Sequence, residues 1–158
     1  MAFKLPLILA ICLTAAGASA KSDGPRSVDG FPEVVDSNVV RIDANAVRLK
    51  GIAVPKASTP DGLNARGWLH RRIQNRRTYC HFEPNPAVTL NIGTCEIEGL
   101  DLSALMVEAG VALDCPKESG GRYRVQQGRA EAAGQRLADR FQLPDNCKTA
   151  GGKLKRGG

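Results

Sequence analysis

Alternating apolar and polar residues predict β-strands in the first half of the chain. The segments 39–43 and 46–50 both alternate with a period of two, which is typical of half-buried strands. Asp43, Ala44 and Asn45 lie between them and have the composition of a tight turn, so the two strands form a predicted hairpin. A shorter segment, 31–36, predicts a strand before the hairpin. Pro55 ends the unit, because proline has no N–H group for pairing.

Apolar residues at helical spacing predict three helices. The first begins at Thr59, which carries a capping hydroxyl and is followed by Pro60 and Asp61. The second is capped by Asp101 and spans 101–110. The third begins at about Arg124 and is expected to continue through Phe141. The apolar stripes are Ala65, Leu69 and Ile73 in the first helix, Leu102, Leu105, Met106 and Ala109 in the second, and Ala130, Ala133, Leu137 and Phe141 in the third.

Two more strands are predicted between the first and second helices. They cover 78–82 and 89–97 and are joined by the loop 83–86, which would place Cys80 near Cys95. An extended segment, 111–113, follows the second helix, and 119–121 reads as a loop. The order of three strands, helix, two strands, helix, extended segment and helix predicts an α+β fold.

The first 20 residues have the features of a signal peptide, with Lys4, an apolar segment and a small-residue cleavage site at Ala18-Ser19-Ala20. We therefore expect a secreted or periplasmic protein. The remainder divides into a flexible lead-in over 21–30, one domain over 31–147, and a basic, glycine-rich, disordered tail over 148–158.

Five cysteines are present, and Cys12 falls in the signal peptide. An even number remains, which in an exported protein favours two disulfides, with three possible pairings; four buried thiols are the alternative. His70 and His81 lack the spacing of zinc ligands, so no zinc site is expected. The remaining cysteines are Cys80, Cys95, Cys115 and Cys147.

The chain is basic, with a formal net charge of +6. This charge permits binding to polyanions such as nucleic acid or acidic polysaccharide, without requiring it. The first predicted helix is basic outside its apolar stripe, which suits a solvated face or a polyanion surface. Its basic residues are Arg66, His70, Arg71, Arg72, Arg76 and Arg77.

Two motifs resemble the staphylococcal-nuclease (thermonuclease-like) family. That family has Asp-Gly-Asp-Thr after its first strand, where this chain has Asp36-Ser37-Asn38-Val39. The family then has Arg-Leu-x-Gly-Ile-Asp-x-Pro-Glu, where residues 48–56 read Arg-Leu-Lys-Gly-Ile-Ala-Val-Pro-Lys. The resemblance extends over about 33–141 and implies a five-stranded OB-type β-barrel with three helices. It also implies calcium-dependent hydrolysis of phosphodiester bonds in DNA and RNA.

Several residues that this chemistry requires are replaced. Asn38 and Ala53 stand where the family has metal-binding aspartates, and Lys56 stands at the glutamate that serves as general base. A protonated lysine only donates hydrogen bonds, so it does not accept a proton from water. Leu90 stands at the second catalytic arginine. The matching residues are Arg48, at the first catalytic arginine, and Asp36, beside the metal site.

The resemblance therefore predicts a site without a metal, in which Arg48 is vestigial or forms a small anion site with Lys56. An ordinary outward-facing arginine and a solvent-exposed lysine are the simpler interpretations. Tyr123 is expected under the last helix or at the rim of a ligand site. In the family frame, the disulfides are Cys80–Cys95 and Cys115–Cys147.

Three functions remain open at this stage. The first is a binding or accessory module for a polyanion, either nucleic acid or an acidic polysaccharide such as the exopolysaccharide succinoglycan. The second is an active secreted nuclease that uses calcium and other acids, such as Asp36, Glu96 or Glu98. The third is a structural envelope protein. The substitutions favour the first, in which the chain is a pseudoenzyme; no sequence feature defines the oligomeric state.

Overall fold

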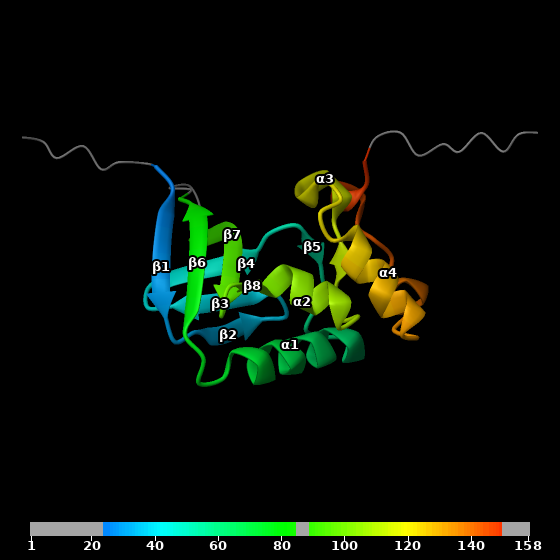
Figure 1. Ribbon diagram of the computed structural model, residues 1–158, viewed down its shortest axis with the longest axis horizontal. Coiled ribbons are helices and arrows are strands. Elements are labelled where there is room, and N and C mark those ends of the chain that lie inside the picture. Colours follow the sequence, from blue (N-terminus) through cyan, green and yellow to red (C-terminus); the bar gives the residue numbers. More distant parts are fainter. Residues whose placement is uncertain (1–23, 85–88, 150–158) are drawn as a thin grey trace, which may run out of the picture.

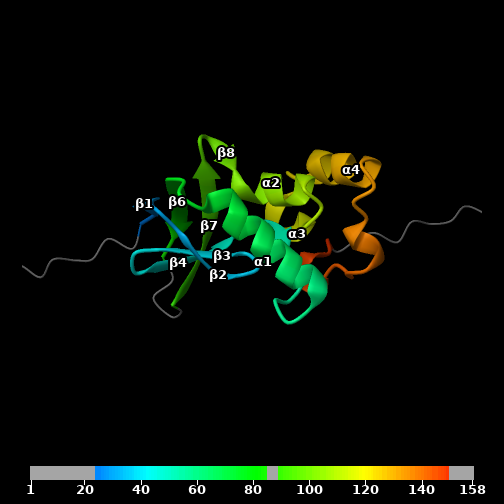
Figure 2. The ribbon, with the colours of Figure 1, turned by 90° about the horizontal axis from the view of Figure 1, so that it is seen from below.

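The computed structural model describes residues 24–84 and 89–149. The predicted signal peptide, most of the predicted tail and part of the 83–86 connection lie outside these residues. The described chain has a curled β-sheet with helices packed along one side and at one end (Figures 1 and 2). The mixed α+β class expected from the sequence is confirmed.

The main sheet has the strand order β1-β6-β7-β4-β3-β2, and β8 pairs with β7. Neighbours are antiparallel except β4 and β7, which are parallel. The edge strands β1 and β2 are joined by only Phe31 and Pro32, so the two edges of the curled sheet are brought close together. The strands are β1 (Arg26–Gly30), β2 (Glu33–Asp36), β3 (Val39–Ile42), β4 (Asn45–Leu49), β6 (Thr78–Glu83), β7 (Leu90–Ile97) and β8 (Leu100–Asp101).

A separate two-stranded ladder joins β5 (Ile52–Ala53) to β9 (Leu113–Asp114). The helices α1 (Pro60–Ile73) and α2 (Leu102–Glu108) pack beside the sheet. The short α3 (Pro116–Ser119) and α4 (Arg124–Ala132) lie at the end away from β1 (Figure 1). Two 3₁₀ turns, η1 (Leu137–Asp139) and η2 (Asp145–Cys147), complete the described chain.

The core forms where the alternating strands meet the helical stripes. Val40, Ile42, Val47 and Leu49 are almost fully buried from β3 and β4, as the period of two predicts. They pack with the buried residues Ala65, Leu69 and Ile73 of α1 and Leu102 and Met106 of α2. Leu105 and Ala109, also expected in the stripe of α2, are partly buried against the same core. A smaller apolar cluster forms at the other end, from Ala53, Cys115, Cys147, Phe141 and Leu143.

The local signals for turns and caps are confirmed. Asn45 pairs with Ile42, so the predicted hairpin has a two-residue turn, and Asp43 adopts a left-handed φ of 52° there. The Thr59 hydroxyl accepts a hydrogen bond from the Gly62 N–H at 3.1 Å and caps α1. Asp101 caps α2 in the same way.

The expected flexible lead-in is wrong for residues 26–30, which form β1. Every residue of β1 is paired with β6, and Val28 packs against the core. The sequence does not predict this strand, because β1 is an edge strand with mostly exposed residues and shows little apolar alternation. Its stability comes from pairing with a strand about 50 residues further along the chain.

The third predicted helix is too long. α4 ends at Ala132, and Gly134 has a φ of 81°, which breaks the helix. Leu137 then lies in η1, and Phe141 packs in the smaller cluster. Within the expected loop 119–121, Ser119 is instead the last residue of α3, a helix too short to show a hydrophobic period.

Both disulfides implied by the family resemblance are present. Cys80 bonds to Cys95 between paired positions of β6 and β7, and Cys115 bonds to Cys147 across 32 residues of sequence. Disulfides of this kind are typical of exported proteins. Among the residues that the structure describes, no helix is long and apolar enough to cross a membrane.

Two glycine substitutions should change stability in opposite directions. A Cβ at Gly93 would lie 2.4 Å from the His81 carbonyl oxygen and 2.6 Å from the Phe82 Cβ, so Gly93→Ala should destabilise the fold by about 1–3 kcal/mol. A Cβ at Gly128 would meet nothing within 4 Å, so Gly128→Ala should stabilise α4 by up to about 1 kcal/mol. Urea unfolding measures both; equal effects would contradict the packing around Gly93.

Candidate anion-binding site

The site is built around the corner between β4 and β5, where Gly51 turns the chain. Gly51 has a φ of 82°, a conformation that other residues rarely adopt. A Cβ there would lie 2.9 Å from the Tyr123 ring and 3.1 Å from the Ser119 Cβ. The Gly51 carbonyl accepts a hydrogen bond from the Cys115 N–H at 2.9 Å. The corner therefore requires glycine and joins the sheet to the segment that contains α3.

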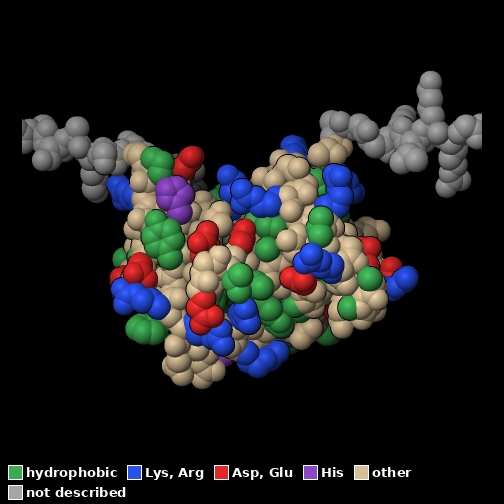
Figure 3. Space-filling model, in the orientation of Figure 1, with side chains coloured by type: hydrophobic (Ala, Val, Ile, Leu, Met, Phe, Trp, Pro, Cys, Tyr) green, Lys and Arg blue, Asp and Glu red, His purple; other side chains and the backbone are tan. Residues whose placement is uncertain are grey.

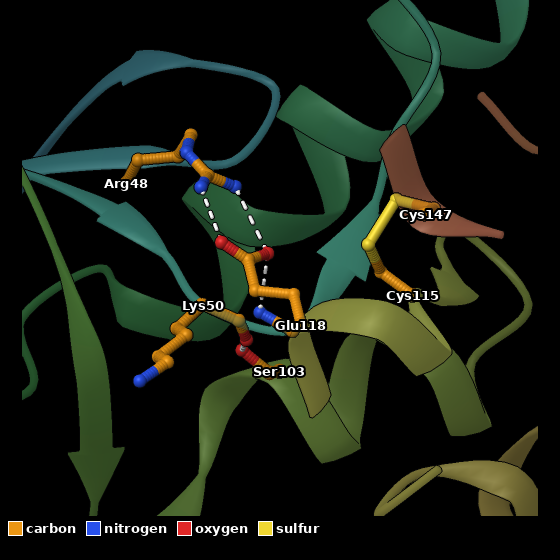
Figure 4. A network of polar contacts seen from close by, with 7 residues as sticks. Arg48, Lys50, Ser103, Cys115, Glu118 and Cys147 are labelled. Carbon is orange, nitrogen blue, oxygen red and sulfur yellow. Dashed lines mark hydrogen bonds and ion pairs between the residues drawn. A yellow bond between two sulfur atoms is a disulfide. The ribbon is translucent and has the colours of Figure 1, made fainter. Parts of the chain in front are cut away.

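Glu118 of α3 places its carboxylate against this corner (Figure 4). Its Oε1 lies 2.5 Å from Arg48 Nη2, and its Oε2 lies 3.4 Å from Arg48 Nη1. The Gly51 N–H donates to the same Oε2 at 2.9 Å. The Arg48 and Glu118 side chains are 27% and 23% exposed, so the pair is more shielded than an ordinary surface ion pair. The guanidinium of Arg48 is thus neutralised by the carboxylate of Glu118 from the same chain.

The surroundings of Glu118 favour its charged form. Burial raises the pKa of Glu118, but the hydrogen bonds from Arg48 and the Gly51 N–H outweigh it, together with the charges of Arg48 and Lys50. The net effect holds the pKa of Glu118 below its ordinary value. The carboxylate therefore remains charged at neutral pH and continues to neutralise Arg48.

A second polar chain supports the corner from the side of α2. The Tyr123 hydroxyl donates to Asp101 Oδ2 at 2.8 Å, while Asp101 Oδ1 accepts from the Ser103 N–H at 2.8 Å. The Ser103 hydroxyl donates to the Lys50 carbonyl at 3.0 Å. Burial, followed by the hydrogen bond to Asp101 and its charge, raises the pKa of Tyr123 to about 12. The backbone at Lys50 is thereby fixed beside α2.

A cavity of about 200 Å³ opens between the Gly51 corner, β7 and the segment that joins α3 to α4. Its two cationic side chains are Lys50, which is exposed and points away from Arg48 (Figure 4), and Arg122, whose Nη1 lies 4.0 Å from Asp101 Oδ2. Figure 3 shows Lys and Arg side chains gathered in the hollow between the region of β1 and β6 and that of α3. The cavity is lined by Lys50, Gly51, Thr94, Glu118, Ser119, Arg122 and Tyr123.

The structure places the two predicted anion-binding residues in different surroundings. Arg48 lies at the candidate site, held by Glu118. Lys56 is exposed, is not part of the cavity lining, and accepts hydrogen bonds at its carbonyl from the Thr59 N–H and hydroxyl. The joint use of Arg48 and Lys56 remains a prediction; the cations that the cavity brings together are Lys50 and Arg122.

The other residues that align with the family motifs take part in strand pairing or in local hydrogen bonds. Ala53 is 5% exposed and pairs with Leu113 in the β5–β9 ladder. The Asn38 carbonyl accepts from the Leu49 N–H at 2.9 Å, and Asp36 Oδ1 accepts from the Ser37 N–H at 2.7 Å. Leu90 begins β7 opposite Ala46.

The acids considered for an active nuclease lie elsewhere on the surface. Glu96 is exposed on β7 between its partners Tyr79 and Asp101, and Glu98 pairs with Arg76 at 3.5 Å. Within 24–84 and 89–149, no group of three or more His, Cys, Asp and Glu side chains is arranged to hold a metal ion.

Sequence reasoning did not predict Glu118, Lys50 or Arg122 as site residues. Tyr123 was expected under the last helix or at a ligand rim; it is buried at the start of α4, its ring packs against Gly51, and it also lines the cavity. The available signal was Gly51, the glycine within the Arg48–Lys56 motif, which marks the corner. Nothing in the local sequence near Glu118 shows that it would reach Arg48, 70 residues away.

Comparisons with known proteins do not assign this chain to a family. The chain matches no protein-family model and no curated protein. The family resemblance described above therefore remains a prediction, and the functional argument rests on the site geometry.

Glu118→Gln should lower stability at neutral pH by about 1 kcal/mol, because the partly exposed ion pair with Arg48 is lost. The folded-state pKa of Glu118 is depressed, so its contribution is present above the unfolded value of about 4.3 and is lost as pH falls through the folded value. Urea unfolding of both proteins between about pH 7 and pH 3 should show the difference narrowing on acidification. A constant difference would contradict the role of the charged carboxylate.

Tyr123→Phe should remove a proton-release step near pH 12 from an ultraviolet titration and lower stability at neutral pH by about 1 kcal/mol. The hydrogen bond to Asp101 stabilises the fold below the unfolded tyrosine pKa of about 10, and this contribution is lost as pH rises through the folded value. Tyr79→Phe, at an exposed position, is the matched control and should leave the step near 12 in place.

Proposed function

We propose that this chain is an exported binding module for a polyanion, built on a thermonuclease-like OB domain whose calcium-dependent nuclease site is degenerate. The ligand is an acidic polysaccharide or a nucleic acid. The observation that carries the proposal is the cavity beside Gly51, where Lys50 and Arg122 supply positive charge while Glu118 neutralises Arg48.

The strand order supports the finer assignment of the fold. If β1 and β2 are counted as one bent strand, the larger sheet reduces to five principal strands, with parallel pairing between the third and the fifth. A five-stranded, partly open barrel of this kind is the OB architecture, which commonly binds oligonucleotides and oligosaccharides. The fold alone does not define the ligand, so the charged cavity carries the functional argument.

The chemistry of the site favours binding over hydrolysis. Hydrolysis of a phosphodiester in this family requires an arginine that neutralises charge at phosphorus, whereas the guanidinium of Arg48 is already engaged by Glu118. The positions of the general base and of one metal ligand carry Lys56 and the buried Ala53, neither of which supplies an oxygen from its side chain. Lys50 and Arg122 remain suited to anionic groups on a polymer.

An exported location is consistent with the two disulfides and with the predicted signal peptide. Secretion or a periplasmic location would bring the domain to extracellular polymers such as acidic exopolysaccharide. The same location is compatible with binding extracellular nucleic acid, so both ligands belong in one test.

The test measures binding of the purified protein to alginate and to single-stranded oligodeoxythymidine at increasing salt. Binding should weaken as salt rises, because charge–charge contacts are screened. Lys50→Glu combined with Arg122→Glu should weaken binding by about tenfold or more, since two attractive contacts become repulsive. Arg66→Glu combined with Arg71→Glu on α1 has the same charge change at exposed positions and is the matched control.

Other outcomes of these binding measurements would point to a different site or a different function. Loss of binding in Lys56→Glu alone would favour the site of Arg48 and Lys56, and loss in the α1 control would favour the basic helix face. Absence of salt-dependent binding would favour a structural envelope protein. Cleavage of the oligonucleotide that requires calcium, stops with chelator and disappears in Arg48→Ala would establish the nuclease instead.

A further inference from the structure

A larger cavity, of about 520 Å³, lies on the other side of α3. This volume is within the range of small-molecule sites, roughly 300–1,000 Å³. Its lining shares no residue with the cavity beside Gly51, so it is a separate site. It is lined by Leu113, Asp114, Pro116, Arg124, Gln127, Ala138, Phe141, Gln142, Leu143 and Lys148.

The walls of this cavity combine apolar with polar side chains and are partly open to solvent. Phe141 and Leu143 belong to the smaller apolar cluster, yet both keep part of their surface exposed. The other apolar lining residues are Leu113, from β9, Pro116, from the start of α3, and Ala138, from η1. An apolar chain or ring placed here would cover surface that is now exposed to water, which is favourable.

The accessible charges of the lining are positive. Arg124 is exposed and forms no ion pair with a carboxylate among residues 24–84 and 89–149. Lys148 is paired at 2.6 Å with Asp145, whose side chain is 96% exposed. Asp114 is 5% exposed, and its Oδ1 accepts from the Ser119 hydroxyl at 2.6 Å, so it is turned toward α3. Lys148 is therefore shared with Asp145, and an anionic group would meet Arg124 first.

The Cys115–Cys147 disulfide joins the two sides of the cavity. Cys115 directly precedes Pro116, and Cys147 directly precedes Lys148, so both lining residues are attached to the bond. This link fixes the C-terminal segment against α3 and keeps the apolar walls at a constant separation. Preformed walls lower the entropic cost of binding a ligand.

We propose that this cavity binds a small amphiphilic carboxylate, with its apolar part against Phe141, Leu143 and Leu113 and its carboxylate at Arg124. The charge complementarity of the rim selects an anion, and the apolar walls select a hydrocarbon body over a simple ion. This ligand is a free small molecule and is distinct from the polyanion of the other site.

The experiment uses decanoate as the probe and measures its binding to the full chain by calorimetry and by NMR shift mapping, below the micelle concentration of the probe. Saturable one-to-one binding is expected, with shifts at Phe141 and Leu143. Acetate should bind far more weakly because it lacks the apolar body, and decanol because it lacks the charge. Equal binding of decanol would overturn the selection for an anion.

Arg124→Glu should weaken decanoate binding by about tenfold or more, because a charge-assisted hydrogen bond is replaced by repulsion. Arg66→Glu on α1 is the matched charge control and should leave binding unchanged. Circular dichroism confirms that each variant is folded. Binding that is unaffected by Arg124→Glu, shifts confined to other surfaces, or adsorption to anionic vesicles without saturable binding of free decanoate would each overturn the proposal.

Discussion

The contact of Glu118 with Arg48 and the Gly51 N–H joins the C-terminal helices to the sheet. It brings a carboxylate, a guanidinium and a backbone donor together at a corner that is mostly shielded from water. A shielded ion pair contributes more to the free energy of unfolding than a fully exposed pair, which contributes about 0–1 kcal/mol. The pair of Arg41 with Glu33, 49% and 72% exposed, belongs to the second kind. The Glu118 contact therefore dominates the electrostatic attachment of α3.

The same attachment produces both cavities. On one side of α3, the Gly51 corner and Tyr123 leave a small polar cavity between the sheet and the segment that joins α3 to α4. On the other side, the disulfide from Cys115 holds the C-terminal segment across a larger, more apolar one. The Ser119 hydroxyl bonded to Asp114 links the two sides. One short helix, fixed by an ion pair at one face and a covalent bond at its start, thus separates two surfaces of different chemistry.

The parts of the fold that local sequence specifies were predicted well. The β3–β4 hairpin follows from period-two alternation and a turn, and α1 follows from its cap and apolar stripe. The errors occur where distant contacts decide the structure. β1 depends on pairing with β6, and the position of α3 depends on contacts of Glu118 with Gly51 and Arg48. α4 stops where Gly134 adopts a left-handed conformation, although the apolar spacing continues to Phe141.

The candidate site shows the same division between local and distant effects. Alternation along β4 turns Leu49 into the core and leaves Arg48 and Lys50 on the outer side, which the sequence predicts. It does not predict which of these cations is available to a ligand, because that depends on a carboxylate 70 residues away. Glu118 neutralises Arg48, the residue that matches the family motif, while the side chain of Lys50 points the other way, into the cavity with Arg122. The binding capacity proposed for this domain therefore lies two residues beyond the position that the motif alone would select.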